Sequence, residues 1–424
     1  MNLKRRNFIQ LSTLVAGTTL SAGFQSIRTA GENTKATEIL RPMTRDIVPI
    51  SPDERKERVA KAKLLLLQNK TEALVIESGS SMEYFTGISW WPSERTMVAV
   101  IPARGEIIYV CPGFEETRFQ ELITIGKKVY IWQEDESPYE QIAQAFNDFG
   151  ISSGKIGIEE QVRFFIVDGI RKAAPQMEYM SGDPVTIPCR MIKSAAELAL
   201  MQKASDITVA AMKIGISSLK EGVSPDHISA IINKAHRELG AMPDFALILF
   251  GKASAQPHGS VKPQHLKKGD IVLMDCGCKV AGYCSDITRT IVFGAEPTKR
   301  QSDIWNLEQK AQAAGFAAAQ IGIPCEQVDA AARKVITDTG FGPGYQLPGL
   351  PHRTGHGIGM DGHEWGNMVK GNQELLQTGM CFSIEPTISI PGEFGVRLED
   401  CVYMTDKGPK WFSRPAISIH KPFA

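Results

Sequence analysis

Two aspartates occupy matching places in a predicted β-hairpin at residues 271–293. Two apolar, β-branched runs flank the residues Lys-Val-Ala-Gly at 279–282, a pattern typical of a hairpin turn. If the hairpin is symmetric about this turn, Asp275 and Asp286 face each other. Cross-strand Cβ atoms lie roughly 4.5–5.5 Å apart, and like charges placed so repel each other. The pair therefore predicts a divalent cation between the two carboxylates.

Two glutamates repeat this arrangement in a second predicted hairpin, at residues 382–400. Its turn is centred on Gly392, so Glu385 and Glu399 also face each other. A glycine-rich segment that contains His356 lies between the hairpins. Carboxylate oxygens with one imidazole suit Mn, Fe, Co or Zn. Since four carboxylates are too many for one small cation, we expect two metals with shared carboxylates, an arrangement known in hydrolases.

Five of these acidic and histidine residues, taken in their order along the chain, resemble the dimetal site of the pita-bread metallopeptidases. This family includes methionine aminopeptidase, prolidase and aminopeptidase P. The residues are Asp275, Asp286, His356, Glu385 and Glu399. The resemblance extends from about residue 190 to the C-terminus. It implies that these side chains bind two divalent ions, with manganese expected first and cobalt, iron or zinc as alternatives.

Four further residues match family positions around the metals. His258 and His363 correspond to the family's upstream and downstream active-site histidines, while His352 and Arg397 match positions typical of its proline-directed branch. The resemblance implies that a hydroxide bridging the metals attacks the peptide carbonyl, with Glu385 as general base. His258 and His363 would then hold the substrate and stabilise the oxyanion. His352 would lie near the leaving group, and Arg397 would brace the carboxylates.

The chain as a whole predicts an α+β protein of two domains. Residues 46–185 alternate strands and helices, which indicates an α/β domain, and this part resembles the N-terminal domain of the prolidase and creatinase branch. Residues 186–424 predict a catalytic domain of the pita-bread type, with helices outside a curved antiparallel sheet. Its first helix begins with a capping box at Ser194 and Glu197. Trp90 and its neighbour Trp91 fit either core packing or a wall of the substrate cleft or dimer interface.

The first 45 residues predict a twin-arginine signal and a linker. Arg5 and Arg6 precede Phe8 and an apolar run of about 14 residues at 11–24, which is too short for a membrane span. We therefore expect export to the periplasm and no stable membrane span. The chain has 47 basic and 47 acidic residues, and this balance gives no indication of nucleic-acid binding.

Three cysteines cluster in the first hairpin. Alternation predicts that Cys276, Cys278 and Cys284 lie on the face opposite the aspartates, where they act as small buried hydrophobic residues.

The predicted function is that of a metal-dependent exopeptidase that cleaves Xaa-Pro bonds at the N-terminus of short peptides, as a homodimer. One alternative is a metal-dependent hydrolase or lyase of a small non-peptide substrate on the same fold. The other is a non-catalytic binding protein, whose usual sign is an eroded ligand set. All five ligand residues are present in this chain.

Overall fold

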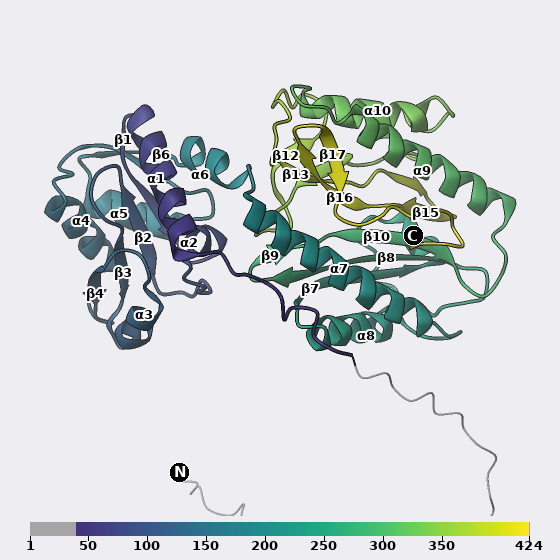
Figure 1. The fold of residues 1–424 in the computed structure, drawn as a ribbon, viewed down its shortest axis with the longest axis horizontal. Coiled ribbons are helices and arrows are strands. Elements are labelled where there is room, and N and C mark those ends of the chain that lie inside the picture. Colours follow the sequence, from purple (N-terminus) through teal and green to yellow (C-terminus); the bar gives the residue numbers. More distant parts are fainter. Residues whose placement is uncertain (1–39, 424) are drawn as a thin grey trace, which may run out of the picture. The chain divides into compact units, whose positions relative to one another are not determined.

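The computed structural model describes residues 40–423 (Figure 1). Of the twin-arginine signal and linker predicted at residues 1–45, residues 1–39 lie outside the described residues. Within the described part, no helix combines the length and apolar character needed to cross a membrane.

The N-terminal domain contains a mixed sheet of six strands. Their order is β4-β3-β2-β1-β5-β6, and the predicted hairpin of β2 and β3 is present as an antiparallel pair. The strands are β1 (Thr71–Glu77), β2 (Val98–Pro102), β3 (Ile108–Pro112), β4 (Lys128–Trp132), β5 (Gly154–Ile158) and β6 (Met177–Ser181). The helices are α1 (Pro52–Gln68), α2 (Ser80–Thr86), α3 (Glu116–Leu122), α4 (Pro138–Asp148), α5 (Phe164–Ala173) and α6 (Asp183–Arg190), with a 3-10 turn, η1, at Gly113–Glu115.

Both faces of this sheet are covered. Val75 and Val100 pack with α4 and α5 on one face. Leu74 and Ile101 on the other face pack with α1, in a core that continues into the second domain. An α/β layer of this kind explains why the strands are apolar on both faces. The predicted domain boundary at residue 185 falls inside α6, from which the chain continues into the second domain.

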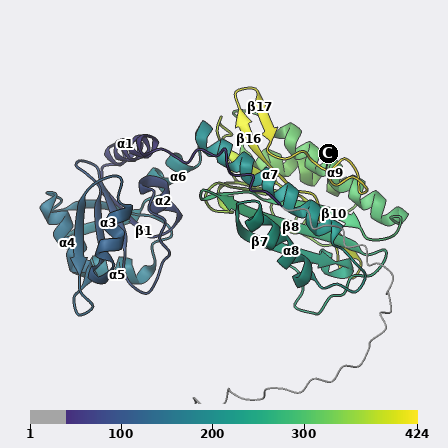
Figure 2. The same cartoon turned by 60° about the horizontal axis from the view of Figure 1, so that its bottom comes forward.

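The second domain begins with two helices that pack against an antiparallel sheet. The helices are α7 (Ala195–Ser217), which has the predicted Ser194–Glu197 capping box, and α8 (Pro225–Glu238). The strands are β7 (Met242–Phe250), β8 (Ile271–Val280), β9 (Tyr283–Cys284) and β10 (Ile287–Val292), with a 3-10 turn, η2, at Gly251–Ala255. Figure 2 shows α7 and α8 beside β7, β8 and β10.

The rest of this domain consists of a second helix pair and two further small sheets. The helices α9 (Lys299–Ala318) and α10 (Cys325–Thr337) pack against each other and against these sheets. The larger sheet has the order β12-β11-β13-β16-β17, and β14 pairs with β15. The strands are β11 (Gly355–Gly357), β12 (Glu364–Met368), β13 (Cys381–Ile384), β14 (Thr387–Ile390), β15 (Phe394–Arg397), β16 (Asp400–Thr405) and β17 (Gly408–Trp411). Helices outside antiparallel sheets confirm the predicted fold class.

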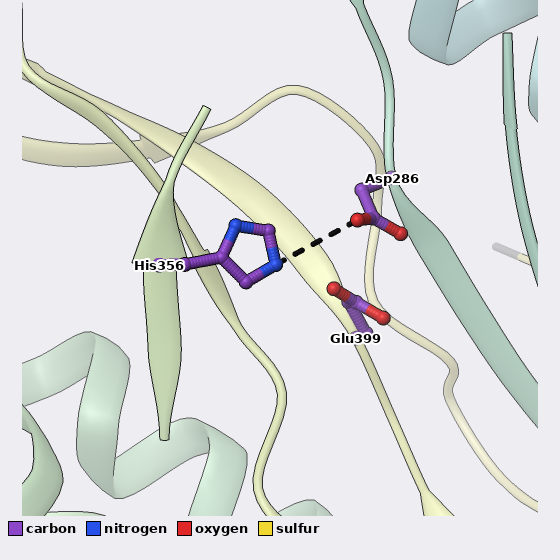
Figure 3. A group of neighbouring side chains, drawn as sticks. All are labelled: Asp286, His356 and Glu399. Atoms are coloured by element: carbon purple, nitrogen blue, oxygen red, sulfur yellow. Dashed lines mark ion pairs between the residues drawn. The ribbon is translucent and has the colours of Figure 1, made fainter. Parts of the chain in front are cut away.

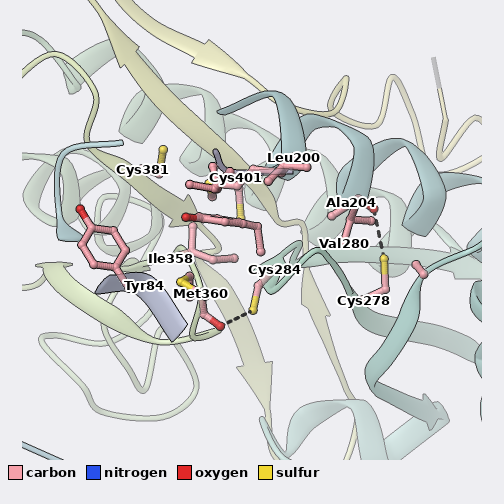
Figure 4. Packing of buried hydrophobic residues seen from close by; sticks show 14 of the residues in the cluster. Tyr84, Leu200, Ala204, Cys278, Val280, Cys284, Ile358, Met360, Cys381 and Cys401 are labelled. Carbon is pink, nitrogen blue, oxygen red and sulfur yellow. Dashed lines mark hydrogen bonds between the residues drawn. The ribbon is translucent and has the colours of Figure 1, made fainter. Parts of the chain in front are cut away.

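The cysteines of the first hairpin are buried, but they do not all share one face (Figure 4). Cys278 lies against α7, where its Sγ is 3.3 Å from the Ala204 carbonyl oxygen. Cys284 pairs with Lys279, so it shares the face of Asp275 instead, and the prediction for this residue is wrong. All eight cysteines of the chain are buried and unpaired.

Candidate metal centre

The first hairpin is present, but its register differs from the predicted one. Val280 pairs with Tyr283, so the turn has only two residues, Ala281 and Gly282, both with positive φ. This is the geometry of a type I′ turn, which suits the twist of the strands. The centre of the hairpin is therefore one residue later than predicted, and Asp275 pairs with Thr288 rather than Asp286.

Asp286 lies in the interruption between β9 and β10, where regular pairing with β8 stops. Gly277 on β8 leaves room for this interruption, because a Cβ there would come 2.4 Å from the Ser285 carbonyl oxygen. The pairs on either side of the interruption, Lys279 with Cys284 and Cys276 with Ile287, keep one register, so Asp286 lies opposite Gly277. Because residues two apart on a strand share a face, Asp286 is on the same side as Asp275, whose charge acts on it.

The second hairpin has the predicted register. Ile384 pairs with Asp400, and Thr387 pairs with Arg397 in the same register. Glu385 and Glu399 lie between these two pairs, so they are opposite each other, as predicted. Both sit where one strand ends and the next begins.

Thr288 joins the two hairpins. Its backbone exchanges two hydrogen bonds of 3.2 Å with Glu399, and its hydroxyl donates to the Glu399 carboxylate at 2.6 Å. Arg397 donates to the same hydroxyl at 3.2 Å and also to the Asp275 carboxylate. Arg397 therefore braces the carboxylates of both hairpins, as expected for a residue that orients metal ligands.

His356 on β11 completes the cluster (Figure 3). Its Nε2 lies 3.1 Å from a Glu385 oxygen and 3.7 Å from an Asp286 oxygen. Asp286, His356 and Glu399 are buried, and each offers a ligand atom within 4.8 Å of the others. Since the Gly357 carbonyl 3.0 Å from Nδ1 can only accept, neutral His356 carries its proton on Nδ1. Its Nε2 lone pair then points at carboxylate oxygens, an arrangement that a cation would stabilise.

The charges in this cluster are not balanced. Burial, together with the neighbouring carboxylates, raises the pKa of Asp286 and of Glu399 well above the ordinary values. Burial alone would also raise the pKa of Glu385, but His356, His352 and Arg397 hold it at about 2. Among the described residues, one carboxylate oxygen each of Asp275, Asp286 and Glu399 is buried without a hydrogen-bond donor. Buried carboxylates of this kind fit divalent metal ions, which supply the missing positive charge.

The remaining predicted residues lie around this cluster. The exposed ring of His363 contacts that of His356 at a centroid distance of 4.1 Å. The ring is exposed on one side only, and the partial burial of the other side lowers the pKa of His363 to about 4, with His356, Arg353 and His258 acting in the same direction. His258 is therefore near enough to His363 for its charge to act on that ring.

His352 is held by two hydrogen bonds. Its Nδ1 lies 2.7 Å from the Arg353 carbonyl oxygen and its Nε2 3.0 Å from the Thr387 hydroxyl. Burial lowers its pKa, while the Glu385 carboxylate acts in the opposite direction. The ring therefore lies beside the strand that follows Glu385.

Sequence reasoning missed two supporting residues. Thr288 lies two positions after Asp286. Ser383 lies two before Glu385, accepts a hydrogen bond from the His356 amide at 3.0 Å and lies 3.2 Å from a Glu385 oxygen. Alternation along the strands was the available signal, because residues two apart share a face.

Residues 199–406 match the model of metallopeptidase family M24, and residues 58–192 match the creatinase/prolidase N-terminal domain. An uncharacterized peptidase of Schizosaccharomyces pombe is 34% identical, over 86% of this chain and 82% of that protein. An uncharacterized peptidase of Staphylococcus aureus is 32% identical, over 81% and 95%. The chain thus belongs to metallopeptidase family M24, whose members use divalent metals.

Solved structures agree with this assignment. A dipeptidase from Pyrococcus horikoshii aligns with a TM-score of 0.77 at 30% identity, covering 84% of this chain and 98% of that one. A prolidase from Thermococcus sibiricus aligns with a TM-score of 0.78 at 30% identity, covering 85% and 97%. Dipeptidase PepE from Mycobacterium ulcerans aligns with a TM-score of 0.79 at 30% identity, covering 87% and 97%.

Proposed function

We propose that this metallopeptidase is an exopeptidase that cleaves Xaa-Pro bonds at the N-terminus of short peptides, using two divalent metal ions. The observation that carries the proposal is the convergence of the two hairpins on one cluster, with His352 and His363 beside it. Support also comes from aligned structures that are described as a prolidase and as an Xaa-Pro dipeptidase.

Five side chains would hold the metals, namely Asp275, Asp286, His356, Glu385 and Glu399. Bound divalent ions supply positive charge that polarises the peptide carbonyl and lowers the pKa of water. Manganese is the ion that we propose first.

Glu385 is the proposed general base. Its pKa of about 2 keeps the carboxylate ionised at neutral pH, so it can accept a proton. The Ser383 hydroxyl donates to one of its oxygens at 3.2 Å and so fixes the carboxylate. A base held in this way needs little reorganisation when the proton moves.

His363 and His258 are the proposed donors to the oxyanion. With its pKa lowered to about 4, His363 is neutral at pH 7 and still has one N–H to donate. Because its side chain is exposed at the cluster, and its ring makes no hydrogen bond with the described protein groups, it can bind a substrate without first breaking one. Loss of such a donor typically costs about 2.7–4 kcal/mol in the barrier.

His352 is the proposed donor to the leaving nitrogen. An Xaa-Pro amide has no N–H, so the departing proline nitrogen needs a proton. The Arg353 carbonyl accepts from Nδ1, so in neutral His352 the Nε2 accepts from the Thr387 hydroxyl. Donation from Nε2 therefore requires that this nitrogen first gains a proton, and the proton that Glu385 takes from the attacking water is the one that the proposed reaction supplies.

The test is an assay of Xaa-Pro and Xaa-Ala di- and tripeptides with protein loaded in turn with Mn, Co, Fe or Zn. We expect cleavage of the bond before proline, with Mn giving the fastest turnover. If a fully metallated sample cleaves no Xaa-Pro peptide, the proposal is wrong and a small non-peptide substrate becomes the better explanation.

We also propose that the chain is exported by the twin-arginine route, on the basis of Arg5 and Arg6. Homodimer formation stays a prediction, and gel filtration with light scattering would measure it.

A further inference from the structure

A buried arginine at the end of the N-terminal domain contacts the turn that carries His363. We infer that this residue, Arg190, is a positioning residue that sets the place of His363 in the active site. The inference rests on the role proposed above for His363.

Arg190 is the last residue of α6, and it is 1% exposed. Its Nη1 donates to the hydroxyls of Ser81 at 2.8 Å and Ser80 at 3.1 Å, at the start of α2. Its Nη2 donates to Asp361 at 2.8 Å and Glu364 at 2.6 Å. One guanidinium thus joins the N-terminal domain to both flanks of His363, and the planar group with several donors suits this task.

The Glu364 carboxylate organises the turn from within. One oxygen accepts the backbone N–H groups of Met360 at 2.9 Å and Asp361 at 3.2 Å, in addition to Arg190. The other oxygen accepts from Lys193 at 2.8 Å. Charge-assisted hydrogen bonds of this kind are stronger than neutral ones. The Glu364 carboxylate therefore fixes the backbone of the turn, and Arg190 is one of the two cations that hold this carboxylate in place.

His363 has no comparable anchor of its own. Its side chain is exposed, and among the described residues its ring nitrogens make no hydrogen bond with protein groups. Its contact is with the ring of His356, at a centroid distance of 4.1 Å and an interplanar angle of 66°. The position of the ring therefore depends on the backbone of residues 360–364.

The N-terminal domain contacts the same turn at three more points. Ser80 donates to Asp361 at 2.6 Å, and Gln161 donates to the same oxygen at 3.1 Å. Trp365, just after the turn, donates to Glu160 at 3.1 Å. This domain therefore forms part of the support of the active site, and Arg190 is its buried charged contact.

Loss of Arg190 would leave the buried Glu364 paired with Lys193 alone and Asp361 without a cation. Because uncompensated buried charges are costly, we expect the turn to move. A shift of about 1 Å in a catalytic group can cost about 100-fold in rate. We expect Arg190→Met to lower kcat by about 10- to 100-fold, with the metal content unchanged, since no proposed ligand contacts Arg190.

The decisive experiment is a double-mutant cycle between Arg190→Met and His363→Ala, read out as kcat for a cleaved peptide. If Arg190 acts through His363, it should change kcat by less than about twofold once His363 is absent, because coupled residues are not additive. An equal loss in both backgrounds would overturn the inference. Should His363→Ala alone leave kcat unchanged, the proposed role of His363 would fail instead.

Arg58 provides a matched control. It is 6% exposed and also joins the two domains, through a hydrogen bond to Tyr283 and an ion pair with Glu197 at 3.5 Å, but it does not contact the turn. We expect Arg58→Met to lower thermal stability and leave kcat unchanged. If both arginine variants lower kcat equally, a general stability effect explains the loss and the inference falls.

Arg190→Lys provides a second route if the methionine variant does not fold. An ammonium retains the charge but cannot match the two-sided geometry of the guanidinium. We expect kcat between those of the wild type and Arg190→Met, and the same lack of effect in the His363→Ala background. A lysine variant whose loss persists undiminished without His363 would contradict the inference.

Discussion

At the residue scale, Glu308 on α9 is a buried acid that the proposed reaction does not use. It is completely buried, and among the described residues neither carboxylate oxygen has a hydrogen-bond partner. Burial raises its pKa well above the ordinary value, although the Arg397 charge acts in the opposite direction. Keeping such a group in a protein interior costs stability.

We predict that Glu308→Leu raises the free energy of unfolding at pH 8 by about 1–3 kcal/mol. A carboxyl whose pKa is raised in the folded state loses stability as pH rises, so the gain should be larger at pH 8 than at pH 5. Thermal melts at both pH values measure it. A lower melting temperature for the variant at pH 8 would show that Glu308 makes a favourable interaction instead.

The carboxylate cluster could be predicted because acids brought close together across a hairpin repel each other and therefore need a cation. This holds for Asp275 and Asp286 as well, although they are not direct partners. Arg190 could not be found in this way. Its partners are 110 and 174 positions away, at Ser80 and Glu364, and only the tertiary fold brings them together. Glu308 also left no signal, because an acid on a helix normally suggests an exposed face.

At the element scale, the two hairpins differ in how well their sequences define them. The turn at Gly392 fixes a register that continues past Glu385 and Glu399 on both sides. In the first hairpin, the two-residue Ala281–Gly282 turn alone moves the centre of the hairpin one residue further along the chain than predicted, and the register is unchanged across the interruption at Asp286. The predicted symmetry failed because turn type depends on φ values, which the four-residue pattern does not specify.

We predict that Gly277→Ala lowers both the metal content and the melting temperature. The new Cβ would lie 2.4 Å from the Ser285 carbonyl oxygen and 2.5 Å from the Phe245 ring, so the segment leading to Asp286 must move. Overpacking of this kind typically costs about 1–3 kcal/mol. Metal analysis and thermal melts measure the two effects.

Gly157→Ala is the control for this prediction. Gly157 is also a strand glycine, but a Cβ there would approach no atom closer than 3.4 Å. Its metal content should equal that of the wild type. Full metal content in Gly277→Ala would show that the interruption does not set the position of Asp286.

At the scale of the whole molecule, the fold class followed from the alternation of strands and helices and from the resemblance in the second domain. The shared core could not be predicted, because it depends on how α1 and the N-terminal sheet pack against residues of α7 and β8. The contacts between Arg190 and the turn that carries His363 also depend on how the two domains pack. Experiments on this site therefore need the chain with both domains present.

We predict that replacing Arg5 and Arg6 by lysine keeps the precursor in the cytoplasm. The proposed metal site can form only in a folded chain, and the twin-arginine route exports folded proteins. Cell fractionation with an antibody against the catalytic domain measures the distribution. Unchanged periplasmic protein would contradict this route, and Lys4→Arg serves as the control for a charge-preserving change nearby.

The metal-free protein should lose stability as pH rises, whereas the metallated protein should not. Burial and neighbouring carboxylates raise the pKa values of Asp286 and Glu399, so without metal the folded state takes up protons that the unfolded state releases. That contribution is present at low pH and is lost as pH rises through the raised values. The lowered pKa of Glu385 acts in the opposite sense, but only between about 2 and its ordinary value, below the pH range of the experiment.

We therefore predict that protein treated with EDTA melts at a lower temperature at pH 8 than at pH 5.5, and that added Mn removes most of this difference. Asp286→Asn removes one of the two titrating groups, so the metal-free variant should show a smaller pH dependence, bind less metal and have no peptidase activity. Melts of wild type and variant, with and without Mn at both pH values, measure all three. A metal-free wild type that is as stable at pH 8 as at pH 5.5 would mean that the carboxylate cluster carries no uncompensated charge, and the proposed reason for two bound metals would be lost.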